Sequence, residues 1–495
     1  MLPIYKYHVE YGGLFAETTI ISFLKQRGNF LNAKFMEECT FLWTSHSKVP
    51  WEKVLQSDII VSCYPVRTAL VRKDALRITL RSRLLDAAFR QGLSERVIKR
   101  IRNACPDFIL LKDQLSHLKK KKNLKNIHEK DKVIKDDYKT LDNFFEIEQE
   151  KLIQKILTNT DDTDTSFWVL KDVSTNNSLG VRFISQTDLH LLLLNVNTYS
   201  TKDKMILQCI KEQEDQEDQD SSIHLVSNSQ QVIVEEYIQN PVLLSGRKFH
   251  LRVNVLAIGN IAIYVHKDVI CHCACEPYSI NKETFISKNS SFTHITNNCI
   301  QKSHPLYTRK THTILLSEAI FRINQEVHTK ENMSLSLSTD SIFNEICQII
   351  RDTFAVLMQG RATTWPLLKD IDGIDPTFVP NQQLPPASFI PNKSSFELFG
   401  WDFILAYKED TFDNTSGKKV TKVVPIVLEV NGGPALEGVA WPMMCRRVLG
   451  DALETIETIL LQKCTKSDDE CDKNNKDNES LEFPPKSIGD FLRVL

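Results

Sequence analysis

Alternating apolar and polar residues along the chain predict three blocks of β-strands, separated by helical and polar segments. The strands are expected at residues 167–171, 181–184, 232–238, 249–257, 261–265, 403–406 and 424–430. The first two flank a polar loop, which is typical of a β-hairpin. Because strands and helices are mixed in separated blocks, the pattern predicts an α+β fold with mostly antiparallel sheets.

The N-terminal segment has a pattern of its own. Residues 5–30 predict a strand followed by a helix, in which Ala16, Ile20, Ile21 and Leu24 recur at helical spacing. A short buried strand is expected at residues 59–62. We therefore expect a small N-terminal α/β domain over residues 1–66.

Polar runs set the other expected boundaries. A central domain is expected over residues 67–240, with polar insertions near 112–140 and 211–222. A C-terminal domain is expected over residues 241–460. Residues 461–495 include a run rich in Asp, Asn and Lys, and we expect them to form a polar, flexible tail.

Length and composition favour a soluble protein. The chain has 495 residues, of which 42% are hydrophobic, so it can bury a large core. Its first residues lack a basic start followed by an apolar run, so no secretory signal is expected. No apolar run approaches the roughly 18–20 residues that span a bilayer. No membrane partner is therefore expected.

The 12 cysteines are scattered along the chain, which favours free thiols in a reducing compartment such as the cytoplasm. Cys271, Cys273 and Cys275 alternate, so a strand would place them on one face and could offer them to a metal. No second cluster has zinc-ligand spacing. Buried core thiols are therefore the favoured interpretation of these three residues.

Positive charge is concentrated in residues 61–105. This stretch holds eleven Lys or Arg and three Asp or Glu, a net charge of +8, although the whole chain has a net charge of −2. One interpretation is a solvated helical face. The other is a surface that attracts an acidic partner, either nucleic acid or an acidic protein tail. Composition alone does not choose between them.

The strongest candidate site is the sequence LEVNGGP at residues 428–434. On a strand, Glu429 and Asn431 point to the same face, and Asp402 would join them from an adjacent strand. Carboxylate and amide oxygens are the ligands that Mg²⁺ prefers, above all when it is bound to phosphates. The alternative is an ordinary strand that ends in an Asn-Gly turn.

A second candidate site is cationic. Lys248, His250 and Arg252 alternate on one expected strand, with Phe249 between the first two facing a core. Clustered cations favour an anion such as phosphate among them. The alternative is a solvent-exposed strand face. Lys171, at the end of another expected strand, is a weaker candidate for the same role.

Several segments, taken in order, resemble motifs of the tubulin–tyrosine ligase family, most closely its short, tyrosine-adding members. They are WVLK (168–171), VEEYIQNPVLL (234–244), RKFHLR (247–252), EPY (276–278), HITNNCIQK (294–302), FELFGWDF (396–403) and LEVNGGP (428–434). The resemblance covers about residues 4–448. It implies an ATP-grasp fold, in which the nucleotide is held between two largely antiparallel sheets.

The resemblance also implies site residues. The metal ligands would be Asp402, Glu429 and Asn431. The catalytic residues would be Arg252, Lys171 and Asn297. The residues around ATP would be Lys171, Glu235, Glu236, Tyr237, Ile238, Lys248, His250 and Thr296. Within that set, residues 235–238 would line the adenine largely through their backbone, and the lysines would reach the phosphates or ribose.

The implied function is an ATP- and Mg²⁺-dependent ligase that adds tyrosine to the C-terminal carboxylate of detyrosinated α-tubulin through an acyl phosphate. Its partners would be free tyrosine and the acidic tail of α-tubulin, alone or in the αβ dimer, which favours a protein tail over nucleic acid. Its place would be the cytoplasm or the cytoskeleton. Two alternatives stay open: a glutamate or glycine ligase acting on tubulin or another acidic protein, and a catalytically weak member that binds nucleotide or tubulin.

The chain departs from the family pattern at three places, and the first of them supports the last alternative, whereas the intact Asp402, Glu429 and Asn431 oppose it. Where the family has a Gly-rich loop with a further Lys, residues 172–180 keep only Gly180. Fewer glycines limit how closely backbone N–H groups approach phosphates. His250 stands where the family commonly has Asp, and His272 where it tends to carry Arg.

Overall fold

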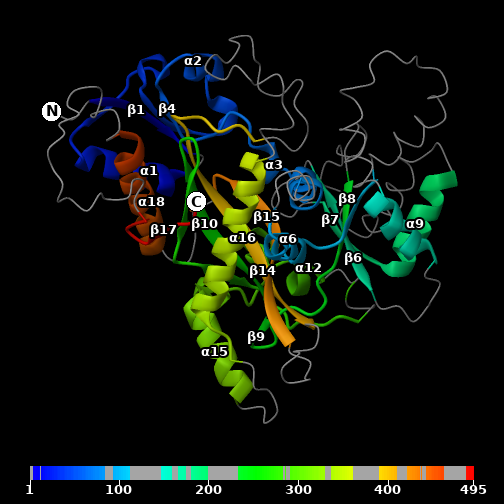
Figure 1. Ribbon diagram of the computed structural model, residues 1–495. Helices are drawn as coiled ribbons and strands as arrows, with labels where there is room; N and C mark the ends of the chain where they lie inside the picture. Colours follow the sequence, from blue (N-terminus) through cyan, green and yellow to red (C-terminus); the bar gives the residue numbers. More distant parts are fainter. Residues whose placement is uncertain are drawn as a thin grey trace, which may run out of the picture.

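The chain folds around three β-sheets (Figure 1). The computed structural model describes residues 4–11, 13–83, 93–111, 147–158, 166–173, 180–198, 232–281, 285, 290–328, 336–359, 389–409, 421–434, 436, 442–461 and 486–495. The expected insertions near 112–140 and 211–222, most of the loop over residues 172–180, and the first part of the expected tail lie outside these ranges.

The N-terminal sheet has the strand order β2-β1-β3-β4, and its strands pair in parallel. Its elements are β1 (Tyr5–Glu10), α1 (Leu14–Gln26), β2 (Phe30–Asn32), β3 (Phe41–Thr44), α2 (Trp51–Leu55) and β4 (Ile60–Val61). The expected strand and helix over residues 5–30 are present. Ala16, Ile20 and Leu24 are buried on one side of α1, as their spacing predicts, and Ile21 is partly buried against the same core.

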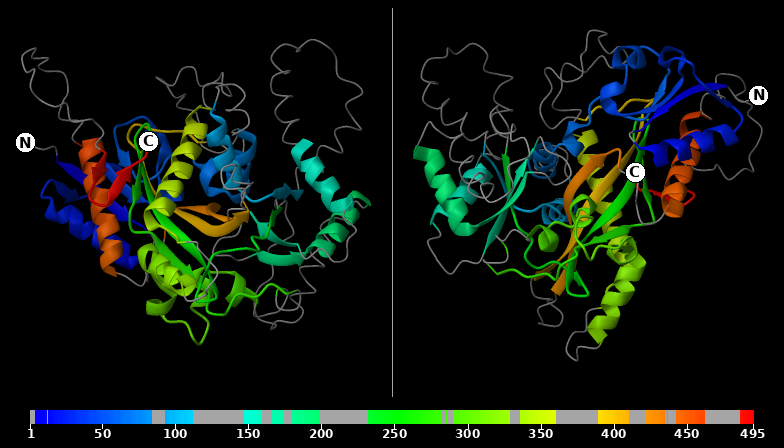
Figure 2. Two further views of the ribbon diagram at one scale, coloured as in Figure 1. Left: turned by 60° about the horizontal axis from the view of Figure 1, so that its bottom comes forward. Right: turned by 180° about the vertical axis from the view of Figure 1, so that it is seen from behind.

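The central sheet is antiparallel and has the order β5-β8-β6-β7. It contains β5 (Phe108–Leu110), β6 (Phe167–Asp172), β7 (Val181–Ser185) and β8 (Val232–Glu236). Helix α9 (Gln186–Thr198) packs against one face of this sheet. β6 and β7 form the expected hairpin, with Val169 opposite Phe183. Figure 2 shows this sheet and the N-terminal sheet at opposite ends of the molecule.

The largest sheet lies between the other two and is antiparallel throughout. Its strands are β9 (Leu243–Leu244), β10 (Arg247–Ile258), β11 (Ala262–His266), β12 (Ile270–Cys273), β13 (Thr313–Leu315), β14 (Phe396–Glu409), β15 (Thr421–Gly432), β16 (Ser487–Ile488) and β17 (Phe491–Arg493). The α+β prediction with largely antiparallel sheets is confirmed.

Helices cover both faces of this sheet. They are α3 (Thr68–Val71), α4 (Lys73–Ile78), α6 (Glu95–Asn103), α12 (Ser290–His294), α13 (Asn298–Gln301), α14 (Arg309–His312), α15 (Leu316–His328), α16 (Thr339–Gln359) and α18 (Pro442–Ile456). On α16, Phe354 packs against Trp401 of β14 with ring centroids 6.1 Å apart. On the other face, α18 lies beside α1 (Figure 1).

Two further predictions can be compared with these elements. Cys271, Cys273 and Cys275 are buried free thiols, and the first two lie in the core beside β10. Among the described residues, no helix has the length and apolar character needed to cross a membrane.

The expectation of a flexible tail is wrong for residues 486–495. Ile488 and Phe491 are buried in the same core as α1 and α18, because these apolar side chains gain more from burial than the short segment loses on ordering. β17 pairs with β11, and the N–H of Val494 donates to the carbonyl of Ile263 at 2.8 Å. The end of the chain is therefore an edge of the largest sheet.

A group of polar residues fastens this terminal hairpin to α18. Asp451 accepts hydrogen bonds from the backbone N–H of Asp490 at 2.9 Å and from Nε2 of His266 at 3.3 Å. Nδ1 of His266 accepts from the N–H of Asp268 at 3.1 Å, so the proton of the neutral ring lies on Nε2. His266, Asp451 and Asp490 are close enough to share a cation, but these hydrogen bonds give His266 a structural role instead.

We predict that Gly489→Ala destabilises the protein more than Gly28→Ala. Both glycines have positive φ, +54° and +74°, so both substitutions carry the same backbone penalty. A Cβ at Gly489 would lie 2.5 Å from Cγ of Asp451, whereas nothing lies within 4 Å of one at Gly28. Overpacking adds about 1–3 kcal/mol, measured as the free energy of unfolding in urea. Equal losses for the two variants would contradict the proposed fastening.

Candidate functional site

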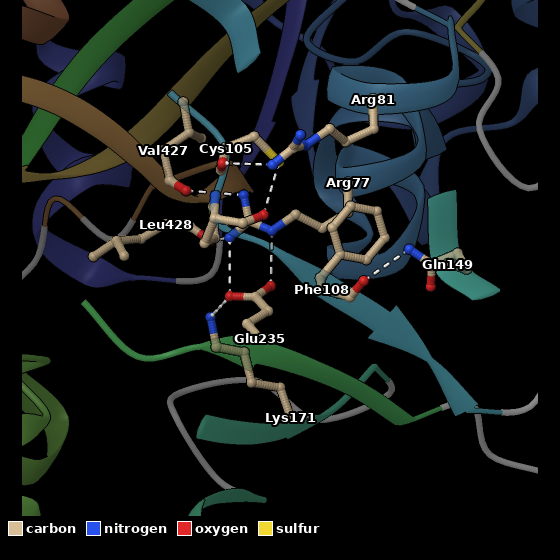
Figure 3. A network of polar contacts seen from close by, with 10 residues as sticks. Arg77, Arg81, Cys105, Phe108, Gln149, Lys171, Glu235, Val427 and Leu428 are labelled. Atoms are coloured by element: carbon tan, nitrogen blue, oxygen red, sulfur yellow. Dashed lines mark hydrogen bonds and ion pairs between the residues drawn. The ribbon is translucent and has the colours of Figure 1, made fainter. Parts of the chain in front are cut away.

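A buried ion-pair network lies where α4 meets the central and largest sheets (Figure 3). Arg77 of α4 is 1% exposed, and its Nε and Nη2 donate to the two carboxylate oxygens of Glu235 at 2.7 and 3.1 Å. Nζ of Lys171, from β6, donates to the same carboxylate at 2.5 Å. Burial raises the pKa of Glu235, but Arg77 and Lys171 outweigh it and lower the pKa to about 2. The carboxylate is therefore ionised at neutral pH.

The same guanidinium also holds β15. Nη1 and Nη2 of Arg77 donate to the carbonyl oxygens of Val427 and Leu428, each at 2.9 Å. Val427 lies at the bulge where the register of β14 and β15 shifts, so its neighbourhood needs donors other than the strand ladder. Only the planar fork of an arginine can reach a carboxylate and two carbonyls at once. Arg77 therefore fixes β8 and β15 relative to each other.

Glu429, the residue after Leu428 on β15, is one of the three expected metal ligands, and the structure brings all three together. Asp402 of β14 lies opposite Glu429, and Gly400 lies opposite Asn431. Nδ2 of Asn431 is 3.3 Å from Asp402 Oδ2 and 3.2 Å from Glu429 Oε1. Arg252 of β10 donates from Nε and Nη2 to Asp402 at 2.5 and 2.9 Å.

These ligands fit a hard divalent cation. Burial and the charge of Asp402 raise the pKa of Glu429, which is the sign of two carboxylates short of positive charge. Together with the amide oxygen of Asn431 they form an all-oxygen donor set, which suits Mg²⁺. The structure thus places two carboxylates opposite each other on neighbouring strands, that of Asp402 buried and that of Glu429 partly buried.

Lys248 of β10 is buried rather than exposed, so the alternative of a solvent-exposed strand face is wrong. Its Nζ donates to the hydroxyl of Tyr237 and to the carbonyl of His294, both at 3.0 Å. It also lies 4.4 Å from the centre of the Tyr237 ring. Burial and the nearby charge of Lys171 lower the pKa of Lys248 to about 7.

His250 is buried on the same strand, two residues further on. Its Nδ1 lies 2.6 Å from the hydroxyl of Thr296, so the structure brings these two predicted residues together. Burial, then the charges of Arg252 and Lys248, lower the pKa of His250 to about 3. The ring of His272, opposite His250 on β12, lies 5.0 Å away.

Other predicted residues have different surroundings. The side chain of Glu236 is exposed, on the opposite face of β8 from Glu235. Ile238 packs against a small core formed by β14 and β15. Asn297 caps α13, its Oδ1 accepting from the N–H of Cys299 at 2.9 Å. The backbone groups of residues 236 and 238 could still contact the adenine, as the resemblance implies. Asn297, which the resemblance makes catalytic, has its side-chain oxygen engaged in the helix cap.

Arg77 and Lys73 are site residues that sequence reasoning missed, because it placed both in a basic surface. Nζ of Lys73 donates to the carbonyl of Asp172 at 3.1 Å, directly after Lys171 on β6. Burial lowers the pKa of Lys73. A signal was available: Glu235 directly follows three apolar residues of its strand, and a buried carboxylate needs a buried partner.

The predicted basic surface is itself largely absent from the described residues. Most of its side chains pair with acidic groups of the protein, and within the part of the stretch that the structure describes, only Arg96 and Lys99 are exposed and make no ion pair. The pairs are Arg67 with Glu397, Arg72 with Asp74, Arg77 with Glu235, Arg81 with Asp107, Arg100 with Asp352, and Arg102 with Glu148. These paired side chains are already engaged by acidic groups of the protein itself. They therefore give little support to the interpretation of this stretch as a surface that attracts an acidic partner.

We predict that Arg77→Ala lowers the free energy of unfolding by about 3–5 kcal/mol, because Glu235 would keep a buried charge with less compensation. Arg322→Ala is the matched control: its pair with Glu318 is exposed, so its loss should cost less than about 0.5 kcal/mol. Urea unfolding measures both. A loss for Arg77→Ala as small as that of the control would show that the network does not hold the sheets.

Comparison of the whole chain with solved structures identifies its fold. The C-terminal domain of Pby1 from K. lactis is described as an ATP-grasp enzyme that interacts with the mRNA decapping enzyme Dcp2. Its structure matches 99% of this chain and 98% of its own with a TM-score of 0.50, at 14% identity. The fold is therefore that of the ATP-grasp enzymes, as the resemblance implied.

Sequence comparison gives the family. A protein named a probable tubulin–tyrosine ligase from Schizosaccharomyces pombe is 24% identical over 408 residues, 81% of each chain. A tubulin glycylase from Tetrahymena thermophila and a probable tubulin polyglutamylase from Rattus norvegicus are 26% and 25% identical over 216 and 206 residues. These matches span 43% and 41% of this chain but only 16% and 33% of those relatives. The profile of the tubulin-tyrosine ligase family matches residues 104–467, and the chain belongs to that family.

Proposed function

We propose that this protein is an ATP-dependent ligase that joins tyrosine to the C-terminal carboxylate of detyrosinated α-tubulin. The observation that carries the proposal is the convergence of two groups of charge. The carboxylates of Asp402 and Glu429 lie on β14 and β15, and the cations Lys171 and Lys248 lie on β6 and β10. Phosphates bridged by a cation need both groups.

Each residue then has a role in binding ATP. Asp402, Glu429 and Asn431 would hold Mg²⁺, which when bound neutralises charge on the phosphates. Lys171 and Lys248 would bind phosphate oxygens, and the backbone of residues 235–238 would contact the adenine. Lys248 loses solvation on burial, and a phosphate would restore its charge.

The chemistry proceeds in two transfers. The γ-phosphoryl group moves from ATP to an oxygen of the protein carboxylate, giving ADP and an acyl phosphate. The amino nitrogen of tyrosine then attacks the acyl carbon, an amide bond forms, and inorganic phosphate leaves. Arg252 and Lys171 would stabilise the charge that spreads over the moving phosphoryl group.

The choice of tyrosine and tubulin rests on one relative. The probable tubulin–tyrosine ligase of Schizosaccharomyces pombe matches across 81% of both chains, whereas the glycylase and polyglutamylase match over less than half of this chain. Those two relatives support the second candidate, a glycine or glutamate ligase.

A direct assay separates the two candidates: purified protein, ATP and Mg²⁺ are incubated with detyrosinated tubulin and radiolabelled tyrosine, glutamate or glycine. ATP-dependent labelling of α-tubulin by tyrosine is expected, and labelling only by glutamate or glycine would overturn that choice.

We predict that Glu429→Gln lowers ligation by about 100-fold or more while the protein stays folded, because a neutral amide cannot supply the charge a divalent cation draws from a carboxylate. Glu318→Gln is the matched control, since Glu318 is exposed on α15, and it should keep full activity. Initial rates of amino-acid incorporation measure the effect, and circular dichroism checks the fold. Near-normal rates for Glu429→Gln, with unchanged dependence on Mg²⁺, would exclude this residue from the site.

We predict that the binding of an ATP analogue takes up close to one proton at pH 8.5. The pKa of Lys248 is about 7 in the unbound protein, so the amine is then mostly neutral, and phosphates would raise that pKa. Affinity should therefore fall as the pH rises above 7, by up to about tenfold per pH unit. Calorimetry in buffers of different ionisation enthalpy measures the uptake. Lys248→Arg, which stays charged, should abolish it; binding with no proton uptake by the unaltered protein would contradict this role of Lys248.

A further inference from the structure

One nitrogen in the site lacks a hydrogen-bond partner. His250 is 5% exposed, and its Nδ1 is engaged by the hydroxyl of Thr296 at 2.6 Å. Its Nε2 is buried and, among the described residues, has no hydrogen-bond partner. The nearest acidic atom is Oδ1 of Asp402, 4.0 Å from Nε2, too far for a hydrogen bond. Leaving such an atom unsatisfied costs about 1–3 kcal/mol, which a ligand bound at Nε2 would recover.

The neighbouring side chains fix the orientation of this ring. Thr296 holds one nitrogen, and the ring of His272 lies 5.0 Å away on the adjacent strand. His272 is itself held, because its Nδ1 lies 2.9 Å from Nδ2 of Asn298. The unpartnered nitrogen is thereby kept facing Asp402.

The gap between His250 and Asp402 has the size that a metal ion requires. Two ligands of one ion with bonds of about 2.1 Å lie about 3.0 Å apart when adjacent and about 4.2 Å apart when opposite. The distance of 4.0 Å from Nε2 to Oδ1 falls within this range. A neutral imidazole whose Nδ1–H donates to the hydroxyl of Thr296 keeps a lone pair on Nε2, which can bind a metal ion.

We propose that Nε2 of His250 is a further ligand of the divalent cation held by Asp402, Glu429 and Asn431, and that it shifts the preference of the site from Mg²⁺ toward Mn²⁺. This rests on the proposed function, which places the cation at those three residues. An imidazole nitrogen binds transition-metal ions well and Mg²⁺ poorly, whereas an all-oxygen site suits Mg²⁺. One histidine thus gives a mixed nitrogen and oxygen site.

The test is spin-echo envelope modulation of Mn²⁺ bound to the full chain with AMP-PCP, an ATP analogue whose phosphate bridge contains no nitrogen. The unaltered protein should show ¹⁴N modulation from a coordinated imidazole. His250→Asp, which restores an all-oxygen set, should bind Mn²⁺ without that modulation. His312→Gln is the matched control, because Nε2 of His312 is also buried without a partner among the described residues but lies outside the site; it should keep the modulation.

A second readout uses affinity. His250→Asp should lower the ratio of Mn²⁺ to Mg²⁺ affinity about tenfold, measured by competition in the electron paramagnetic resonance of free Mn²⁺. Bound Mn²⁺ with ³¹P coupling but no ¹⁴N modulation in the unaltered protein would overturn this proposal and leave the proposed function standing. Failure of the unaltered protein to bind Mn²⁺ with AMP-PCP would overturn the proposed function as well.

Discussion

The guanidinium of Arg77 is the constraint from which the rest of the site follows. It lies in the interior with an ionised carboxylate, Glu235, on one side and two carbonyls of β15 on the other. The carboxylate of Glu235 on β8 holds the amine of Lys171. The position of β15 fixes that of Glu429, which lies on this strand. Arg77 thus adds a directional link between two sheets that also share a hydrophobic core.

Such a pair is not retained for stability alone. Removing two charges from water costs several kcal/mol per ion, and apolar residues of similar volume often do as well. What apolar residues cannot do is hold a lysine and a bulged strand at fixed positions. The network therefore fixes the positions of Lys171 and of the strand that carries Glu429. In the function proposed above, these two residues act on the phosphates and on the metal ion.

The sequence predicted those features that depend on the two-residue period of a strand. Asp402, Glu429 and Asn431 could be placed together because alternation and strand pairing are local rules, and the structure agrees. It could not predict that Arg77 pairs with Glu235, which lies 158 positions away in the sequence. From the sequence alone, a cation in a short helix is expected at the surface, because the elements that bury it are distant in the chain. The terminal hairpin was missed for the same reason: Phe491 is buried only because α18 and β11 are there to cover it.

The most direct test of this account is a crystal structure of the full chain with AMP-PCP and Mn²⁺, with data collected at the manganese absorption edge. The anomalous difference map should show a peak beside the carboxylates of Asp402 and Glu429, with the analogue's phosphates between that peak and Lys171 and Lys248. A peak elsewhere in the molecule, or phosphates bound away from these lysines, would contradict the claim that this network builds the nucleotide site.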